Sequence, residues 1–540
     1  MTWRRASVEV PTTEGGVMAR SSHVGIRARV ARASQIGRVL WSSETSWLGD
    51  ALTVRECGSL RCRLHCAAGL DQCPHHLALE HPLPDRIREV LEQLGPTFVK
   101  LGQMLALRPD YLPLPYAQAL QRLHTHAVPF DAAAARQTVE LELRAPLRRL
   151  FRDFEPEPFA AASLSQVHRA MLPDGRRVAV KVQRPGVSEL VARDLALLRW
   201  MAGSIERHRP GALAFRPTDA VDELAAYTTR ELDFRREAMV SEQIRRNSAA
   251  DHRFVVPAVH RQLSTSRVLT TDLIDGLEPA PAAELTVAGI DPEKVLAAGA
   301  SWMVRQLFTD GLFHADPHPG NILLLPDNRV CLLDFGMFGR LDRVQRRRMG
   351  LMLLALIGGD YASVGTQLLR MSTLRPGADP RGFRDAVADL VEDWYEAETG
   401  MTAAQLLLRD LGLGSSFGIV FPRELMLLCR SLVTLESTAR VIRPDLDLST
   451  LLRPLLPQLL LALLPTPANL WATLREQRID YLALALDMPD LLVDLADTLR
   501  HRGVLDQLTA AVAPPPPRSW LPAVATVAGG GWLLRGLRPR

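Results

Sequence analysis

The clearest chemical signal in the sequence is an aspartate and an asparagine five residues apart, Asp316 and Asn321, followed by Asp334 in an Asp-Phe-Gly sequence. Phosphoryl transfer needs a carboxylate near the attacking oxygen and oxygen ligands that hold magnesium against the phosphates. Asp and Asn at such a spacing also occur by chance in ordinary turns, which favour both residues. Together with the downstream Asp-Phe-Gly, however, this spacing predicts a magnesium-dependent phosphate site.

A lysine, Lys181, ends the apolar run Val178-Ala179-Val180, which reads as a strand. A compact ammonium at that place would reach phosphate oxygens, and it needs a glutamate on a following helix to orient it. Glu237 is our first candidate for this partner. Glu231 and Asp233 are rivals on the same helical segment, and each acid taken alone could be an ordinary solvated residue.

Lysine is rare in this chain, because only Lys100, Lys181 and Lys294 occur among 64 basic residues. Arginine and lysine differ in shape, hydration and donor geometry. A lysine kept where arginine is otherwise used therefore suggests a position that needs a compact charge. Lys294, in a plain helical pattern, is expected on a helix surface.

The segment that precedes Lys181 by one hairpin is rich in alanine, where kinases carry a glycine-rich phosphate loop. Alanine does not adopt positive φ cheaply, so this turn should be stiffer and hold the backbone further from phosphate. We expect it to line the nucleotide site, together with Asp272 at the end of a later β-type run. The predicted loop consists of Ala160, Ala161, Ala162 and Ser163.

These residues must be positioned by a small sheet followed by helices. Residues 167–171, a Pro-Asp-Gly turn and residues 178–182 predict a β-hairpin, and short β-type runs follow at 254–259 and 268–274. Helical periodicity covers 131–151, 187–207 and 219–247, and it dominates after 277 apart from a hairpin near 321–336. This order predicts the α+β class, with a sheet-containing lobe before a larger helical lobe.

Taken together, the motifs resemble those of the UbiB family of atypical protein-kinase-like proteins, which are tied to ubiquinone and other isoprenoid-lipid metabolism. The resemblance spans about 84–340, and the helical remainder is compatible to roughly 450. Besides the residues above, it rests on Lys100-Leu101-Gly102-Gln103, which matches the KxGQ motif, and Glu231-Leu232-Asp233, which matches the ExD motif.

The resemblance implies a protein-kinase-like, two-lobed fold with an N-terminal helical KxGQ extension over the place of a peptide substrate. It also implies ATP or ADP and Mg²⁺ as ligands, and ATPase-like activity more readily than protein phosphorylation. By motif position, Lys181 pairs with Glu237, Asp316 is the catalytic carboxylate, and Asn321 and Asp334 are the metal ligands. The implied lid over the site consists of Lys100, Gln103, Glu231 and Asp233.

The chain departs from the family pattern at three places near these motifs. Leu164-Ser165 stands where Ile-Gly is usual, Ala106 where serine is usual, and Val240 where asparagine is usual. None of these changes removes a group that would bind phosphate or metal. They bear on the conformation of the alanine-rich loop and on the details of the lid.

We predict five segments along the chain. Residues 1–80 form a poorly ordered extension, 81–130 the KxGQ helices, 131–276 the sheet-containing lobe and 277–510 the helical lobe, and 511–540 a proline-rich spacer with a short apolar end. The uncharged stretch 519–534 is shorter than the ~18–20 residues that span a bilayer. A membrane anchor and a docking helix are equally compatible with it.

Composition excludes several classes of protein. The net charge of +4, with 60 acidic residues interspersed among the basic ones, speaks against nucleic-acid binding. Six cysteines and no apolar signal segment indicate a reducing, cytoplasmic compartment. Four of these cysteines are crowded near histidines and fit plain thiols or a metal site: Cys57, Cys62, Cys66 and Cys73.

We therefore expect a UbiB-type ATPase or kinase, peripheral or C-terminally anchored at the inner membrane. The implied partners are a nucleotide, an isoprenoid or anionic lipid and quinone-biosynthesis proteins. Two alternatives stay open. One is a true small-molecule or protein kinase, and the other is a non-catalytic lipid-binding scaffold.

Overall fold

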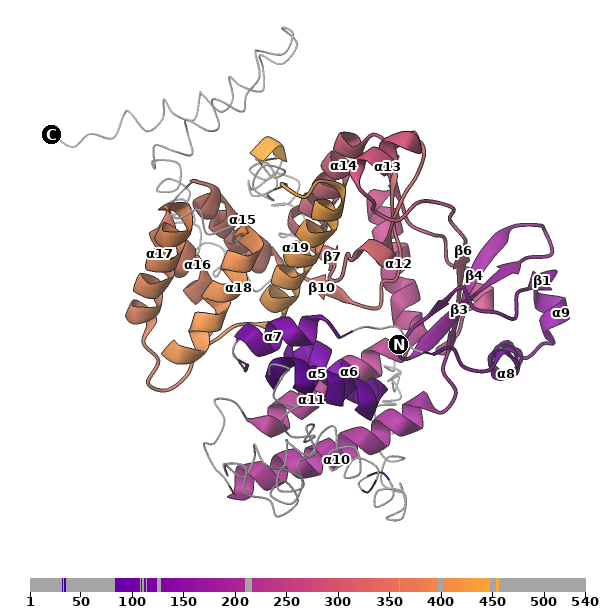
Figure 1. Cartoon of the computed structure of the whole chain (residues 1–540), viewed down its shortest axis with the longest axis horizontal. Helices are drawn as coiled ribbons and strands as arrows, with labels where there is room; N and C mark the ends of the chain where they lie inside the picture. Colours follow the sequence, from indigo (N-terminus) through magenta and orange to yellow (C-terminus); the bar gives the residue numbers. More distant parts are fainter. Residues whose placement is uncertain are drawn as a thin grey trace, which may run out of the picture.

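The computed structural model describes residues 83–446, with gaps at 107, 109–110, 113, 124–127, 209–215, 359 and 397–401, and also Arg32, Ser34 and residues 453–455. The described part comprises a sheet-containing lobe, a helical lobe and a layer of helices beside their junction (Figure 1). The expected extension at 1–80, with its four cysteines, lies outside the described residues apart from Arg32 and Ser34, and so does the tail at 511–540.

The sheet-containing lobe is built on the predicted hairpin, which the strand register confirms. Strands β3 (Ser165–Met171) and β4 (Arg177–Gln183) pair antiparallel, and β6 (Val268–Asp272) pairs antiparallel with the other edge of β4. The short strands β1 (Asp153–Phe154) and β2 (Ala160–Ala161) both pair with β3. All five strands therefore form one antiparallel sheet.

Side chains along β4 alternate between the core of this lobe and the face that carries the site. Val178, Val180 and Val182 are fully buried in a cluster with α8 (Ala132–Leu143), which is followed by α9 (Leu147–Leu150). Successive side chains of a strand point to opposite faces. Lys181, between two of these valines, therefore points to the face away from that cluster.

The segment 219–247, predicted as one helix, is two helices in the structure. Helix α11 (Pro217–Glu231) ends at the Glu-Leu-Asp sequence, and α12 (Phe234–Ser248) begins directly after it. The break arises because the Asp233 carboxylate accepts a hydrogen bond from the Arg235 N–H and so acts as the N-cap of α12. The change of direction separates Glu231 from Glu237.

A helical layer joins two segments that are distant in sequence. Helices α5 (Leu83–Leu94), α6 (Pro96–Leu105) and α7 (Leu114–Gln121) pack on one another, and α10 (Val187–His208) and α11 both contact α6. Helices α10 and α11 lie in the sequence range that we expected for the sheet-containing lobe. In space they extend the layer of the KxGQ helix (Figure 1).

Most elements of the helical lobe follow residue 277, although β5 (Phe254–Val255), which precedes that residue, pairs with β9 (Val330–Leu332) of this lobe. Short strands form three small sheets: β5, β9 and β8 (Ile322–Leu324); β7 (Leu312–His314) with β10 (Phe338–Arg340); and β11 (Thr373–Leu374) with β12 (Ile419–Val420). Its helices are α13 (Ala282–Val287), α14 (Pro292–Val304) with a π-helical end (Arg305–Asp310), α15 (Arg343–Gly358), α16 (Tyr361–Arg370), α17 (Pro380–Glu396), α18 (Ala403–Leu413) and α19 (Arg423–Ile442). Short 3-10 turns are Arg261–Leu263, Pro319–Asn321, Gly414–Phe417 and Arg453–Leu455.

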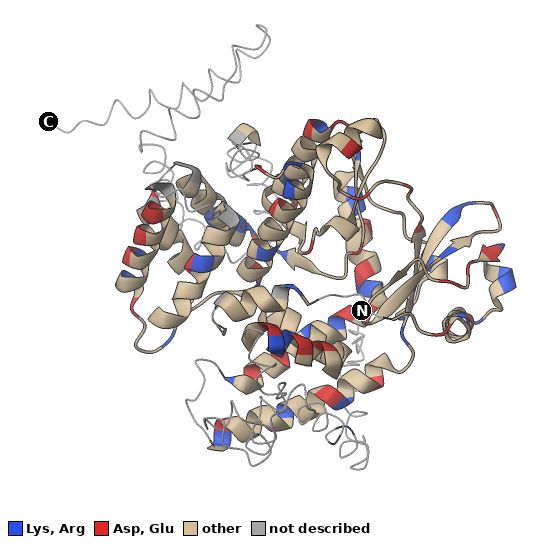
Figure 2. Ribbon diagram, in the orientation of Figure 1, with Lys and Arg blue, Asp and Glu red and all other residues tan. Residues whose placement is uncertain are grey.

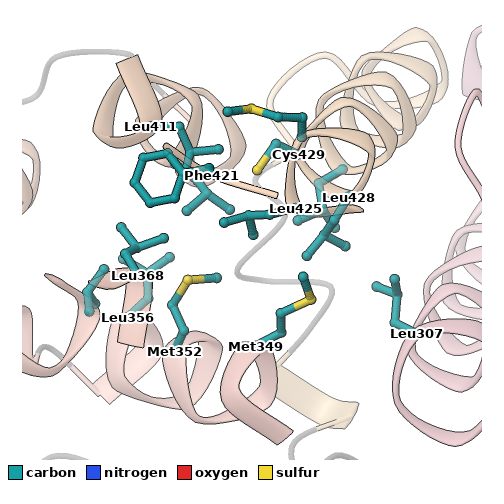
Figure 3. Packing of buried hydrophobic residues seen from close by; sticks show 14 of the residues in the cluster. Leu307, Met349, Met352, Leu356, Leu368, Leu411, Phe421, Leu425, Leu428 and Cys429 are labelled. Atoms are coloured by element: carbon teal, nitrogen blue, oxygen red, sulfur yellow. The ribbon is translucent and has the colours of Figure 1, made fainter. Parts of the chain in front are cut away.

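A sulfur-rich apolar core fixes α19 within this lobe (Figure 3). Met349 and Met352 of α15 face Leu425 and Leu428 of α19 across it, and Cys429 of α19 is fully buried. Methionine side chains fill irregular gaps because they are unbranched and flexible. This packing holds one face of α19 in the core and leaves the opposite face to the junction of the lobes.

Charged residues of both signs are interspersed over the described helices (Figure 2). In the described part of the chain, the structure has no helix that is both long and apolar enough to cross a membrane.

We predict that Gly102→Ala destabilises the helical layer by about 1–3 kcal/mol, as expected for overpacking. A Cβ atom at residue 102 of α6 would clash with the terminal methyl groups of Leu123 and Leu91, on the neighbouring segments. Thermal or urea unfolding of the variant measures the loss. The matched control is Gly299→Ala in α14, where an added Cβ meets no atom within 4 Å, and we expect unchanged or increased stability.

Candidate active site

A cavity of about 670 Å³ is lined by residues of the two lobes and of the helical layer. The alanine-rich turn and β4 line it from the sheet-containing lobe, α6 and α11 from the helical layer, and the Asp316 loop and α19 from the helical lobe. Its polar and charged lining residues include Lys100, Gln103, Ser163, Lys181, Tyr227, Glu231, Glu237, Glu278, Asp316, Asn321, Asp334, Arg430 and Thr434.

Lys181 is held between two carboxylates from different parts of the chain. Its Nζ lies 2.9 Å from both carboxylate oxygens of Glu237 on α12 and 3.1 Å from Oδ2 of Asp334. Of the three acids considered as its partner, the structure therefore pairs Lys181 with Glu237. The contact to Asp334 ties the sheet-containing lobe to the Asp-Phe-Gly segment.

The two carboxylates that share this ammonium differ in their acidity. Burial raises the pKa of Glu237 to about 7, although Lys181 acts to lower it. Burial would also raise the pKa of Asp334, but Lys181 and the N–H of Gly336 outweigh it and hold that pKa well below its usual value. The pKa of Lys181 would be lowered by burial and is raised by its two partners. Ionised, the trio carries one negative charge in excess, which suits a bound cation.

His314 locks the Asp316 loop to the Asp334 segment. Its Nε2 lies 3.0 Å from the carbonyl oxygen of Leu333 and 2.8 Å from that of Asp334, whereas its Nδ1 accepts a hydrogen bond of 3.1 Å from the Asp316 N–H. These partners require the proton on Nε2. Burial lowers the pKa of His314, so the ring stays neutral and keeps this arrangement at neutral pH.

Asn321 and Asp334 provide the oxygen atoms that a magnesium ion would need. The Asn321 amide N–H donates to the Asp316 carbonyl oxygen over 3.1 Å, which leaves the amide oxygen for a ligand. Asp334 has φ of 47°, a left-handed conformation that is uncommon outside glycine, and its Oδ1 accepts from the Gly336 N–H. Amide and carboxylate oxygens are the donors that Mg²⁺ prefers, so these residues fit it.

The lid residues lie on α6 and α11. Lys100 forms an ion pair with Glu231, and the Lys100 side chain is only 7% exposed. Gln103, one turn further along α6, lines the cavity. Asp233 caps α12 and is not among the lining residues, so its contribution is to the helix break beside the lid.

Not all residues of the expected nucleotide loop reach the cavity. Ala162 and Ser163 line it at the turn between β2 and β3, and the Ala162 N–H donates to the Ser165 carbonyl oxygen over 2.8 Å. Ala160 and Ala161 form β2 and are not among the lining residues. Asp272 also lies outside the lining, because its carboxylate contacts His260 Nε2 at 2.8 Å.

Sequence reasoning missed Arg430, which lies on α19 beside Asp316. Arg430 Nη2 donates to Asp316 Oδ2 over 2.9 Å, across 114 positions of sequence. Two neighbours on α19 hold the same loop, since Ser431 donates to the His314 carbonyl oxygen (2.7 Å) and Thr438 to that of Pro317 (2.9 Å). Polar residues recurring on one otherwise apolar helix were the available signal.

The arrangement has the parts that phosphoryl transfer requires. A lysine held by a glutamate can bind phosphate oxygens, two oxygen ligands can hold magnesium, and a third carboxylate, Asp316, stands at the end of the loop for the acceptor. These groups, Lys181, Asp316, Asn321 and Asp334, come from both lobes. The cavity that they line is large enough for a nucleotide-sized molecule.

Two family models match separate parts of the chain. Residues 122–368 match the ABC1 atypical kinase-like domain, and residues 388–447 match the UbiB helical domain. The probable protein kinase UbiB of Marinobacter nauticus is 32% identical over 437 residues, which cover 80% of each chain. That of Aliivibrio fischeri (strain MJ11) is 32% identical over 434 residues, which cover 79% of each chain.

The structure is also similar to that of Rv3197 from Mycobacterium tuberculosis, solved in complex with erythromycin, with a TM-score of 0.47, 25% identity and coverage of 72% of this chain and 99% of that one. The matched domains account for both lobes, and the expected α+β, kinase-like, two-lobed fold is confirmed. With a relative 32% identical over four fifths of both chains, the protein belongs to the UbiB family of atypical kinase-like proteins.

Proposed function

We propose that this protein binds Mg²⁺-ATP and hydrolyses it, and that this activity supports isoprenoid quinone lipid metabolism at the cytoplasmic face of a membrane. The observation that carries the proposal is Lys181, held by Glu237 and Asp334 in the cavity that also contains Asp316 and Asn321. The lipid, the quinone-biosynthesis partners and the inner-membrane location rest on family membership.

Five residues of the site have separate roles in this proposal. Lys181 binds phosphate oxygens of the nucleotide, and Glu237 keeps its ammonium in place. Asn321 and Asp334 hold magnesium, which when bound neutralises charge on the phosphates. Asp316 orients the attacking hydroxyl through the carboxylate oxygen that Arg430 leaves open.

Two features favour hydrolysis or transfer to a small acceptor over transfer to a protein. Helix α6 and the Lys100–Glu231 pair bound the cavity on the acceptor side, where a peptide would have to lie. Arg430 occupies one oxygen of Asp316. A protein or small-molecule kinase is the second candidate, and it is distinguished by transfer of labelled phosphate to an acceptor other than water.

A non-catalytic scaffold is less consistent with this site. Burying Lys181 between two carboxylates costs desolvation energy that an apolar core would avoid. A protein that only kept the fold would have no need of Asp316, Asn321 and Asp334 together. Co-purification of a lipid without any ATPase activity would favour the scaffold.

The deciding experiment combines thermal shift and ATPase assays of the full chain, with Mg²⁺ and ATP or ADP, in the absence and presence of vesicles. Vesicles of phosphatidylglycerol, with and without ubiquinone, test the lipid. We expect stabilisation by Mg²⁺-nucleotide and phosphate release that the vesicles increase. Absence of magnesium-dependent nucleotide binding would refute the proposal.

We predict that Asp334→Asn lowers the magnesium-dependent affinity for nucleotide by at least about tenfold, because it removes a charged metal ligand and an anchor of Lys181. Titration of ADP with and without Mg²⁺ measures the effect. Affinity equal to that of the unchanged protein in both conditions would show that Asp334 holds no metal.

We predict that Lys181→Arg and Lys100→Arg each lower ATP turnover by about tenfold or more, although charge is kept. A planar guanidinium cannot occupy the place of the Lys181 ammonium, which contacts three oxygens at 2.9–3.1 Å. The matched control is Lys294→Arg, since Lys294 is 67% exposed and pairs with Asp291 in its own helix turn. Unchanged turnover in all three would remove the special role of these lysines.

We predict that kcat/KM for Mg²⁺-ATP rises as pH increases through about 7, because ionised Glu237 is needed to orient Lys181. In Glu237→Gln this inflection disappears and turnover is low throughout. The same shift makes the contribution of Glu237 to folding stability fall as pH rises from about 4.5 to about 7, because the folded chain keeps a proton that the unfolded chain releases. A flat profile in the unchanged protein would contradict the assignment.

A further inference from the structure

Tyr227, which no motif marked, lines the same cavity as the Lys100–Glu231 and Arg430–Asp316 ion pairs. It lies on α11, one turn before Glu231, and lines the cavity together with Asp316 and Arg430. Lys100 Nζ lies 5.9 Å from the centroid of its ring, and Arg423 Cζ of α19 lies 5.7 Å from it. The ring is thus placed between the lid and α19.

The phenol oxygen of Tyr227 has no hydrogen-bond partner within the described residues, although the side chain is only 8% exposed. This oxygen is not among the fully enclosed polar atoms without a partner, so it is open to the cavity and can bond to a molecule that enters it. Burial raises the pKa of Tyr227 well above its usual value, and the nearby charges of Glu231 and Asp316 act in the same direction. The phenol is therefore a neutral donor with an unused proton.

The space beside this phenol favours one kind of ligand. Tyr227 also borders a smaller hollow of about 20 Å³, which has room for little more than one water molecule. The larger cavity contains Asp316, whose Oδ2 is taken by Arg430 and whose Oδ1 is left for a donor. Tyr227 and Asp316 line the same cavity, and an acceptor hydroxyl is the kind of group that can donate to a carboxylate and accept from a phenol at once.

We propose that Tyr227 binds the hydroxyl group, of water or of a small alcohol, that receives the phosphoryl group. This inference rests on the function proposed above and names the acceptor subsite within it. The Tyr227 O–H donates to one lone pair of the acceptor oxygen, and the acceptor's own proton passes to Asp316. The other lone pair forms the bond to the γ-phosphorus, while the bond to the β–γ bridging oxygen breaks and its electron pair stays on ADP.

The alternative role for Tyr227 is purely structural, with the ring packed between Lys100 and Arg423. Tyr227→Phe separates the two roles, because it keeps the ring and removes only the donor. Tyr227→Leu removes both. Tyr116→Phe is the matched control, since Tyr116 lies on α7 in the same helical layer and is not among the lining residues.

The experiment measures three quantities for the full-length protein and each variant: the Kd of Mg²⁺-ADP, the Kd of Mg²⁺-ADP with aluminium fluoride, and kcat for ATP. Aluminium fluoride with ADP mimics the transferring phosphoryl group with the attacking water in place. For Tyr227→Phe we expect the Kd of Mg²⁺-ADP to stay within about twofold, while the aluminium fluoride complex weakens and kcat falls by about tenfold. Tyr116→Phe should match the unchanged protein in all three.

The outcomes are distinguishable. If Tyr227→Phe behaves as the unchanged protein while Tyr227→Leu loses thermal stability, the residue is structural and the inference is wrong. An unchanged protein that binds Mg²⁺-ADP but gains nothing from aluminium fluoride has no such acceptor subsite, which also overturns it. Failure of the unchanged protein to bind Mg²⁺-ADP at all refutes the proposed function instead.

Discussion

The placement of one ammonium between two carboxylates determines the geometry of the site. Lys181 extends from β4, Glu237 from α12 and Asp334 from the segment after β9, so the three charges join the sheet-containing lobe to the helical lobe. Removing Lys181 would leave the carboxylates of Glu237 and Asp334 facing each other without their cation, which is costly. The relative position of the lobes, and therefore the width of the cavity, depends on this contact.

The second constraint is the anchoring of the Asp316 loop from two sides. His314 fastens the loop to the backbone of residues 333 and 334, and α19 fastens it through Ser431 and Thr438. Helix α19 is in turn fixed by the methionine-rich core, so the packing of the helical lobe sets where Asp316 stands. A residue such as Arg430 can then contact Asp316 accurately although 114 positions separate them.

Local patterns of sequence predicted the β3–β4 hairpin, the helical lobe and the group formed by Lys181, Glu237, Asp316, Asn321 and Asp334. They succeeded because period-two alternation and short motifs are local properties of the chain. They failed at Asp233, where a cap broke an otherwise continuous helical pattern, and at Asp272, which contacts His260 instead of the cavity. The contacts of Arg430 and Tyr227 depend on tertiary packing of distant helices; polar residues on the apolar helix α19 could mark Arg430 as unusual, but not its partner.

The structure also gives a physical reason for the uneven use of lysine. Lys181 contacts three carboxylate oxygens from two directions, which suits a compact tetrahedral donor better than a planar fork. Lys100 is almost fully buried beside Glu231 and against the Tyr227 ring, where a longer, branched head group would displace α6. Lys294 has no such constraint, because it is 67% exposed and pairs within its own helix. Burial alone does not select lysine, because Arg108 is about as buried as Lys100 and pairs with Glu223 of the same helix α11. What distinguishes Lys181 is the convergence of three carboxylate oxygens on one point, which a compact cation can meet.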